Sequence, residues 1–403
     1  MNSQPLIRQI GLVLALVGVI STPGKGQSIP IGLEEALHIA RAHYAGLEQG
    51  RLSVEQQNKL SETGIPAQPA QLFFSGEEFN FSGQSGVQSI NVQQNFYLPK
   101  AARAQKGYYR QGASLAEKRL ALTGKELKRQ VGQAFYRLQY AKQEQALAAE
   151  NLDLYNNFLA VATAQLESGE TGKIPQLAAR SRLGQAELEQ EHANEKYQIA
   201  FTLFNQWLRS DTLYDAEGEL PLVPRTSVDT SLQNNPHLQI IQARQELAAA
   251  NVEVQKTQLL PQVNSGLRLQ NAFGTFPLFG YQVGVNVPLF QKAYKGRIEA
   301  AEVGVKVQEA ALKAEKQHLE RTIGELRYRL EHQLHILEYL TGNLRPLVDE
   351  QSEVNLQAYQ EGEIGYLEYL DSLELVMEVK QQYLNALHQF NALQVELDYW
   401  LEN

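Results

Sequence analysis

The chain has 403 residues, with 36 Lys and Arg against 45 Asp and Glu, which gives a net charge of -9. The charges are spread along the chain without a basic block, and this argues against nucleic acid as a partner. The chain contains no cysteine, which excludes disulfide bonds, thiolate-bound metals, thiol nucleophiles and a lipidated cysteine as a membrane anchor.

Residues 1–26 have the features of a secretory signal peptide. Arg8 precedes an apolar run from Ile10 to Ile20, and small and polar residues follow up to Gln27. The run is shorter than the roughly 20 apolar residues that span a bilayer, so we expect cleavage near Gly26, with an uncleaved anchor as the alternative. An exported chain of this kind is expected to be either soluble outside the cytoplasm or a β-barrel in an outer membrane.

The chain repeats itself once. Pro69 falls on Pro261 at a shift of 192 residues, and Ser168 falls on Glu361 at a shift of 193. A nearly constant shift over roughly 130 residues indicates one duplicated unit, because insertions in loops would have changed it. We therefore predict a first structural repeat over 27–209, a loop-rich connector over 210–230 and a second structural repeat over 231–403.

Each repeat is expected to contain a shorter helix, two strands and a long helical hairpin. The alternation of apolar and polar residues from Tyr281 to Val287 is typical of a strand with one apolar face. In the first repeat, Gly83–Gly86 form the expected turn between the strands, since glycine permits a positive φ. The predicted strands are 72–81, 87–98, 263–273 and 281–290. The predicted helices are 33–60, 101–167, 174–209, 294–360 and 366–401.

The longest predicted helices would reach about 90 to 100 Å, more than a compact core needs. Their apolar residues recur in steps of seven, four and three, the spacing of a coiled-coil seam. In the second repeat the seam positions are Leu312, Leu319, Ile323, Leu326, Leu330, Leu334 and Leu337, facing Leu370, Leu373, Met377, Leu384 and Leu387. We therefore predict a mainly α fold with a small β part, in which long helices pack lengthwise.

Four strands in one chain cannot close a barrel, because their outer edges would remain unpaired. Several chains must then contribute, and three chains would supply twelve strands, a plausible size for a pore. The alternative is a soluble periplasmic coiled-coil scaffold with two exposed hairpins. Apolar hairpins left uncovered would aggregate, which disfavours that alternative.

Three motifs carry a family resemblance. Asn235-Pro236 opens the second repeat, Val287-Pro288-Leu289-Phe290 leaves the last strand, and the third motif is Ala358–Asp371 with the sequence AYQEGEIGYLEYLD. With the duplicated order of elements, they make the chain similar to the TolC-like outer-membrane factors, also called outer membrane efflux proteins. The resemblance covers nearly all of the chain after the signal peptide.

The resemblance implies a homotrimer with a twelve-stranded β-barrel in the outer membrane and a coiled-coil α-helical barrel in the periplasm. It implies two partners, a periplasmic adaptor (membrane fusion protein) and an inner-membrane pump of the resistance-nodulation-division type, and no chemistry in the duct. Compact size and a short end after the last helix resemble the Cus/Czc-type cation-efflux branch. A type I protein secretion duct is the alternative that the same architecture would serve.

The resemblance also implies an acidic constriction at the inner tip, carried here by Glu368 and Asp371. Independently, the two carboxylates lie three residues apart on one helix face, so threefold symmetry would place six of them around the axis and favour cations. A solvated helix face near a turn is the alternative. The first repeat has Pro175 and Ala178 at the matching positions, so only the second repeat would supply the ring. Glu at the first position departs from the strict family pattern.

The turns at the ends of the two hairpins are the expected adaptor contact. Gly169 and Gly172 in the first turn and Gly362 and Gly365 in the second would let the helices reverse. Any helical hairpin needs such turns, so their presence alone does not establish a partner. Tyr359 lies where the family often has a tyrosine that holds neighbouring hairpins together, and a tyrosine buried in the seam is the alternative.

No pattern in the chain predicts an enzyme, a cofactor or a metal site. His332 and His335 could share a helix face, a spacing used in metal sites, but solvated histidines are the favoured interpretation. No nucleophile elbow, phosphate-binding loop or dinucleotide fingerprint occurs in a strand-to-helix context. With Met377 as the only methionine after the signal peptide, soft-metal ligation inside the duct is not expected.

Overall fold

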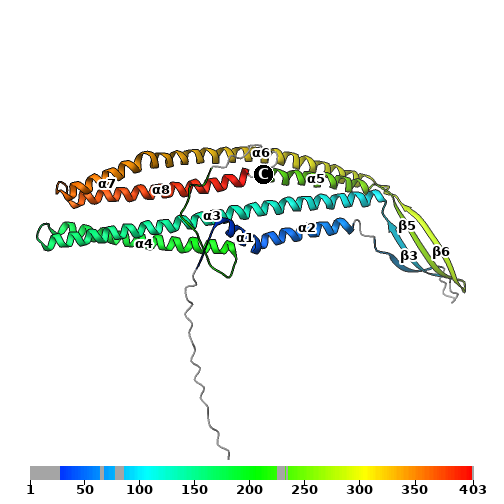
Figure 1. Cartoon of the computed structure of the whole chain (residues 1–403). Helices are drawn as coiled ribbons and strands as arrows, with labels where there is room; N and C mark the ends of the chain where they lie inside the picture. Colours follow the sequence, from blue (N-terminus) through cyan, green and yellow to red (C-terminus); the bar gives the residue numbers. More distant parts are fainter. Residues whose placement is uncertain (1–27, 64–67, 78–85, 225–231, 233–234, 402–403) are drawn as a thin grey trace, which may run out of the picture.

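A computed structural model describes residues 28–63, 68–77, 86–224, 232 and 235–401. The predicted signal peptide, most of the turn at Gly83–Gly86 and part of the connector lie outside these ranges. The described chain is elongated and mainly helical, with a β-sheet at one end and the turns of two helical hairpins at the other (Figure 1).

Both halves of the described chain contain helix, two strands and a long helical hairpin in that order, and the first half adds β1, β4 and a second short helix. The first half contains β1 (Ile29–Ile31), α1 (Leu33–His43), α2 (Ala45–Thr63), β2 (Gln71–Glu77), β3 (Val87–Phe96), α3 (Pro99–Glu167) and α4 (Lys173–Leu208), followed by β4 (Tyr214–Ala216). The second half contains α5 (Pro236–Thr257), β5 (Gln262–Ala272), β6 (Thr275–Asn286), α6 (Lys292–Tyr339), a π-helical segment (Leu340–Leu344), α7 (Arg345–Gln360) and α8 (Tyr366–Leu401).

Helix α3 is uninterrupted over 69 residues, which corresponds to about 100 Å. Pro99 begins it, because the first turn of a helix needs no backbone donor at that position. Helix α4 returns antiparallel to α3 along half of this length, and four alanines spaced seven residues apart let the two backbones approach closely. These buried alanines are Ala179, Ala186, Ala193 and Ala200.

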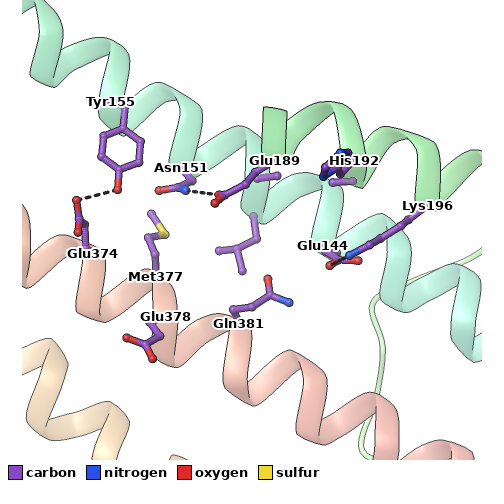
Figure 2. A pocket seen from close by; sticks show the side chains of 13 residues that line it. Glu144, Asn151, Tyr155, Glu189, His192, Lys196, Glu374, Met377, Glu378 and Gln381 are labelled. Atoms are coloured by element: carbon purple, nitrogen blue, oxygen red, sulfur yellow. Dashed lines mark hydrogen bonds and ion pairs between the residues drawn. The ribbon is translucent and has the colours of Figure 1, made fainter. Parts of the chain in front are cut away.

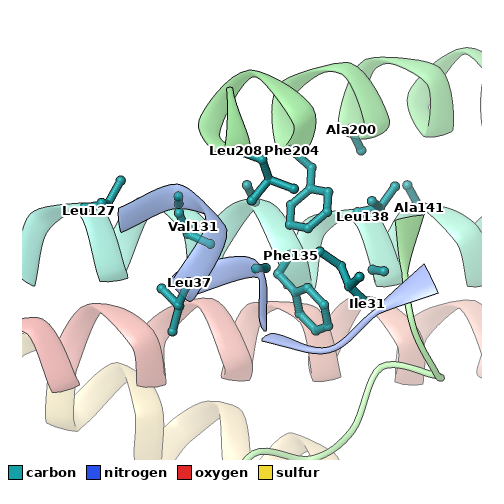
Figure 3. Close-up of a cluster of buried hydrophobic side chains, with 14 of the residues drawn as sticks. Ile31, Leu37, Leu127, Val131, Phe135, Leu138, Ala141, Ala200, Phe204 and Leu208 are labelled. Atoms are coloured by element: carbon teal, nitrogen blue, oxygen red, sulfur yellow. The ribbon is translucent and has the colours of Figure 1, made fainter. Parts of the chain in front are cut away.

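A cluster of buried hydrophobic side chains in the first half lies near the middle of the helices, where β1 and α1 meet α3 and α4 (Figure 3). Phe135 packs edge-on against Phe204 with their ring centroids 5.9 Å apart. β1 pairs in parallel with β4, which joins the start of the described chain to the connector. Ile31 is 2% exposed, so this short strand contributes to the core.

The predicted coiled-coil seam of the second repeat is confirmed along α6 and for the part of α8 that holds Leu384 and Leu387. Leu319, Ile323 and Leu330 are buried against α8, where Leu384 and Leu387 are buried in the same cluster. Leu312 and Leu334 are partly buried beside them. Two predicted seam positions on α8 are wrong, because Leu370 is buried against Phe158 of the first hairpin and Met377 lines a cavity between α8, α3 and α4.

The prediction of one helix over 33–60 is wrong. The chain breaks at Tyr44, whose backbone is extended and whose ring lies 6.2 Å from that of Trp207. A Cβ atom on Gly46 would collide with the Tyr44 ring, so glycine at 46 permits the tight start of α2. The connector, expected to be loop-rich, contains β4.

The helix expected over 294–360 is interrupted by the π-helical segment Leu340–Leu344. Pro346 has no N–H to donate to the carbonyl of Gly342, four residues earlier, so the regular bonding pattern fails there. The Arg345 N–H instead bonds to the Leu340 carbonyl, five residues earlier. The first hairpin has no such interruption in α3.

The strands differ from the predicted ranges at their ends. β6 covers Thr275–Asn286 instead of 281–290, and β3 ends at Phe96 instead of 98. Pro277 lies beside an irregularity in the pairing of β5 with β6. Proline has no backbone N–H, and at such an irregularity no hydrogen bond between the strands is lost. β2 covers Gln71–Glu77, and residues 78–81 of the predicted first strand lie outside the described residues.

The four longer strands form one antiparallel sheet in the order β2-β3-β5-β6. The pairing of β3 with β5 joins the two halves of the chain, with Ile90 opposite Leu269 and Val92 opposite Leu267. Within one chain the sheet is open, since β2 and β6 each have one strand neighbour.

Candidate functional site

The sheet has two chemically different faces. On one face, apolar side chains from all four strands point into solvent, and Phe279 and Tyr281 are 83% and 87% exposed. Cross-strand pairing places Phe74 beside Ile90 and Leu267 beside Tyr281 on this face. A contiguous apolar face of this kind marks a surface that is covered in the working protein. The exposed apolar side chains are Leu72, Phe74, Ile90, Val92, Leu267, Phe279, Tyr281, Val283 and Val285.

The opposite face of the sheet is polar. Asn264 donates to Asn286 across β5 and β6 at 2.9 Å, and Ser75 and Ser89 share a hydrogen bond of 2.8 Å across β2 and β3. The alternation is not strict, since Phe73 lies opposite Asn91 on this face. A sheet with one mainly apolar and one mainly polar face can still separate a hydrocarbon phase from water.

The two hairpin turns at the other end of the molecule have the same geometry. In the first, the Gly169 N–H bonds to the Leu166 carbonyl and the Glu170 N–H to that of Gln165. In the second, the N–H groups of Gly362 and Glu363 make the matching bonds to Tyr359 and Ala358. Both are Schellman motifs, which satisfy the last carbonyls of a helix.

Only one glycine in each turn is required by the backbone. Gly169 and Gly362 both have φ of 78°, a region that other residues enter at a cost. Gly172 has extended backbone as the residue before α4, and Gly365 is not among the residues with positive φ. Gly169 and Gly362 therefore reverse the helices through a positive φ, whereas Gly172 and Gly365 are in the turns without one.

Tyr359 belongs to an aromatic cluster near the second turn. Its ring stacks on Tyr369 at 5.4 Å and meets Tyr366 edge-on at 5.3 Å. Tyr366 in turn stacks on Phe158 of α3, which is 1% exposed. Within one chain Tyr359 is thus a half-buried side chain that links α7 to α8, and through Tyr366 to the first hairpin.

Glu368 and Asp371 are both exposed on the first turns of α8. Glu368 Oε2 accepts a hydrogen bond of 2.9 Å from the Gly365 N–H, so this carboxylate caps the start of its own helix. Asp371 lies one turn further along the same face.

The two hairpins contact each other through a row of polar pairs between α3 and α8. Tyr155 donates to Glu374 at 2.8 Å, and Arg182 of α4 pairs with the same carboxylate at 2.9 Å. Burial and this hydrogen bond raise the pKa of Tyr155 above its usual range. Lys380 pairs with Glu150 at 2.6 Å nearby. Sequence reasoning missed this row, because no periodicity identifies partners that lie half a chain apart.

A cavity of about 420 Å³ lies along this contact, between α3, α4 and α8 (Figure 2). Glu144 and Glu189 line it, and both are partnered, the first by Lys196 at 2.6 Å and the second by Asn151 at 3.2 Å. The described residues contain no group of three or more His, Asp or Glu side chains placed to hold a metal ion. His335 is exposed and lies 3.8 Å from Glu338.

Within the described part of the chain, no helix has a stretch both long and apolar enough to cross a membrane.

Residues 228–401 match the sequence model of a family described as outer membrane efflux protein. The described fold also matches solved structures. CusC, in crystal structures concerned with transmembrane channel formation, aligns with a TM-score of 0.77 at 15% identity over 93% of both chains. The second half of the chain therefore matches the outer membrane efflux protein family.

Two further solved structures resemble this chain over almost its whole length. The Campylobacter jejuni CmeC outer membrane channel aligns at a TM-score of 0.76 and 12% identity over 99% of this chain and 94% of that chain. The open state of the Neisseria gonorrhoeae MtrE outer membrane channel aligns at 0.75 and 15% identity over 100% and 98%. A search of curated protein sequences gave no match.

The family match supports an efflux duct and fits a protein that is not an enzyme. The similarity to CusC is about the same as that to CmeC and MtrE, so these fold comparisons do not select one branch of the outer membrane efflux proteins.

Proposed function

We propose that three copies of this chain form the outer-membrane channel of a tripartite efflux system. The observation that carries the proposal is the open four-stranded sheet with one apolar face, placed at the end of helical hairpins about 100 Å long. Such a sheet needs strand partners at both edges and a hydrocarbon environment for one face.

Three chains would join β2 of one copy to β6 of the next and close twelve strands into a barrel. The apolar side chains would then face outer-membrane lipid and the amide-rich side the water-filled pore. The hairpins α3–α4 and α6–α8 would continue below the barrel as a helical tube in the periplasm, as the packing of apolar seams along their whole length supports.

The two hairpin turns would contact a periplasmic adaptor, through which the channel receives cargo from an inner-membrane pump of the resistance-nodulation-division type. This surface would include Tyr359 and the four glycines of the turns, Gly169, Gly172, Gly362 and Gly365. Ile174 and Leu367, at matching positions of the two turns, are 81% and 46% exposed. Exposed apolar residues repeated at both turns support a docking surface for a protein.

Glu368 and Asp371 are proposed to form the acidic ring at the inner opening. Both carboxylates are exposed in the single chain, and six of them around a threefold axis would attract cations and resist full closure. The cargo would be small molecules or metal cations, and a member of the Cus/Czc-type branch would carry cations.

A type I protein secretion duct and a soluble periplasmic scaffold are the alternatives. The duct would have the same architecture but a secretion ATPase as its inner-membrane partner. The scaffold would leave the apolar face of the sheet in water, which disfavours it.

The test is fractionation of the full chain expressed in a bacterium with two membranes. Washing the membranes with carbonate and banding them on a density gradient should leave the protein in the outer-membrane fraction, and cross-linking should give a trimer. Release of the protein into the wash would contradict the proposal and favour the scaffold.

A further inference from the structure

The described strands of the sheet carry two charged side chains, Glu77 and Arg268. Both belong to the polar face. Glu77 lies two residues after Ser75 in β2 and therefore points to the same face, while Arg268 is paired with Asn91 in the middle of the sheet. All other polar residues of these strands are neutral amides and hydroxyls, so Arg268 is the one cation of the described sheet.

The structure holds Arg268 against the wall of the sheet. Its Nε donates to Asn91 Oδ1 at 2.9 Å, and Asn91 Nδ2 donates to the hydroxyls of Ser89 and Ser75 at 3.0 and 3.1 Å. Asn91 and Ser89 are 5% and 4% exposed, so the anchor is buried while Arg268 itself is exposed.

The position opposite Arg268 on β6 is Gly280. A Cβ there would lie in ordinary contact with the Cβ of Arg268, at 3.6 Å, and glycine places no side chain beside Arg268 on this strand. Among the described residues no carboxylate forms an ion pair with Arg268. Its positive charge is therefore held in place but not neutralised.

We propose that Arg268 selects for anions in the barrel half of the duct. The inference rests on the proposed trimer, in which three copies of Arg268 would form a positive collar on the pore wall. A fixed ring of cations raises the local concentration of anions, such as chloride or solutes with a carboxylate or phosphate group, and lowers that of cations. The duct would then have two charge filters in series, an acidic one at the tip and a basic one in the barrel.

The test is the reversal potential of the purified full-length protein in a planar bilayer with a KCl gradient. The background variant is Glu368→Gln with Asp371→Asn, which neutralises the tip. In that background Arg268→Gln should raise the ratio of potassium to chloride permeability at least about twofold near 0.1 M salt, where charges act over about 10 Å. The difference should nearly vanish at 1 M, where that distance falls to about 3 Å.

Two control variants make the result specific. Arg268→Lys keeps the charge and should keep the permeability ratio within about a fifth of that of the background. Gln282→Asn changes a neutral side chain on the same face and should not alter it. An unchanged ratio in Arg268→Gln channels of normal conductance would overturn the collar alone. A full-length protein that gives no conductance would overturn the proposed channel and, with it, the collar.

Discussion

At the residue scale, the hairpin turns separate two roles of glycine that look alike in the sequence. Gly362 has a positive φ and closes the Schellman motif, whereas Gly365 precedes α8 and donates its N–H to Glu368. A side chain at either position would meet no described heavy atom within 4 Å. Backbone conformation, not space, therefore decides which glycine the fold needs.

Gly362→Ala is expected to destabilise the second turn by about 1 kcal/mol, because alanine in the left-handed region is strained. Gly365→Ala should leave the turn unchanged. Hydrogen exchange of the Glu363 amide, which bonds to the Ala358 carbonyl, measures the difference directly. Equal protection in the two variants would contradict this assignment of roles.

His388 provides a prediction for acid stability. Its ring stacks on Tyr140 at 4.4 Å, and Nδ1 is buried without a hydrogen-bond partner. Burial lowers the pKa of His388, the nearby Arg137 lowers it further, and Glu144 opposes this shift. The folded protein thus favours neutral imidazole.

Because the pKa of His388 is lower in the folded state than in the unfolded state, the stabilisation is present above the unfolded value of about 6.5. It is lost as the pH falls from there through the folded pKa. His388→Gln should reduce the drop in melting temperature between pH 7.5 and pH 5. The matched control His332→Gln, at an exposed position, should keep the full drop. Equal drops in both variants would count against the role of His388.

At the element scale, periodic elements were predictable and short or interrupted ones were not. The heptad steps from Leu312 to Leu337 gave the coiled-coil seam, because a lengthwise helix contact repeats its pattern many times. β1 and β4 have three residues each and pair across half the chain, so no local pattern marks them. The π-helical segment before Pro346 was missed because its apolar residues remain in phase with the seam.

In the candidate site, too, some features could be predicted from the sequence and others could not. The exposure of Glu368 and Asp371 follows from their place after a turn, but the hydrogen bond from Gly365 to Glu368 depends on a backbone geometry that spacing does not reveal. Arg268 could have been noticed as the one cation in the predicted strands. Its anchor on Asn91 could not, since strand pairing between repeats fixes it.

The strand β6 offers a test of which face of the sheet meets lipid. Val283 and Gln282 are neighbours in the strand, so their side chains point to opposite faces of the sheet. Both are exposed in the single chain, and they therefore differ in the face that they occupy. Val283→Lys would place a charge in the hydrocarbon, at a cost of about 2 to 4 kcal/mol near the midplane. Gln282→Lys would place the same charge in the pore and should be tolerated.

The amount of heat-stable trimer in outer-membrane fractions measures this difference. Val283→Lys should lower it strongly while Gln282→Lys stays near the unsubstituted protein. Similar losses in both variants would indicate that neither face is set apart for lipid.

At the scale of the whole molecule, the two halves of the chain resemble each other in the order of their main elements but are unequal in detail. The first hairpin is built on the continuous helix α3, whereas the π-helical segment and Pro346 interrupt its counterpart. The acidic pair of the tip lies in the second half alone, with Pro175 and Ala178 in the first. The sheet, in contrast, requires both halves, because its central pairing joins β3 to β5.

The parallel pair of β1 and β4 has a consequence for the order in which the chain can fold. Ile29–Ile31 are among the first described residues, yet their partners Tyr214–Ala216 follow half a chain later. Contacts between distant segments form slowly. In an outer-membrane channel as proposed above, β1 would have to wait until the entire first hairpin has crossed the inner membrane. The pairing of β1 with β4 would then form only after the first repeat has been fully exported.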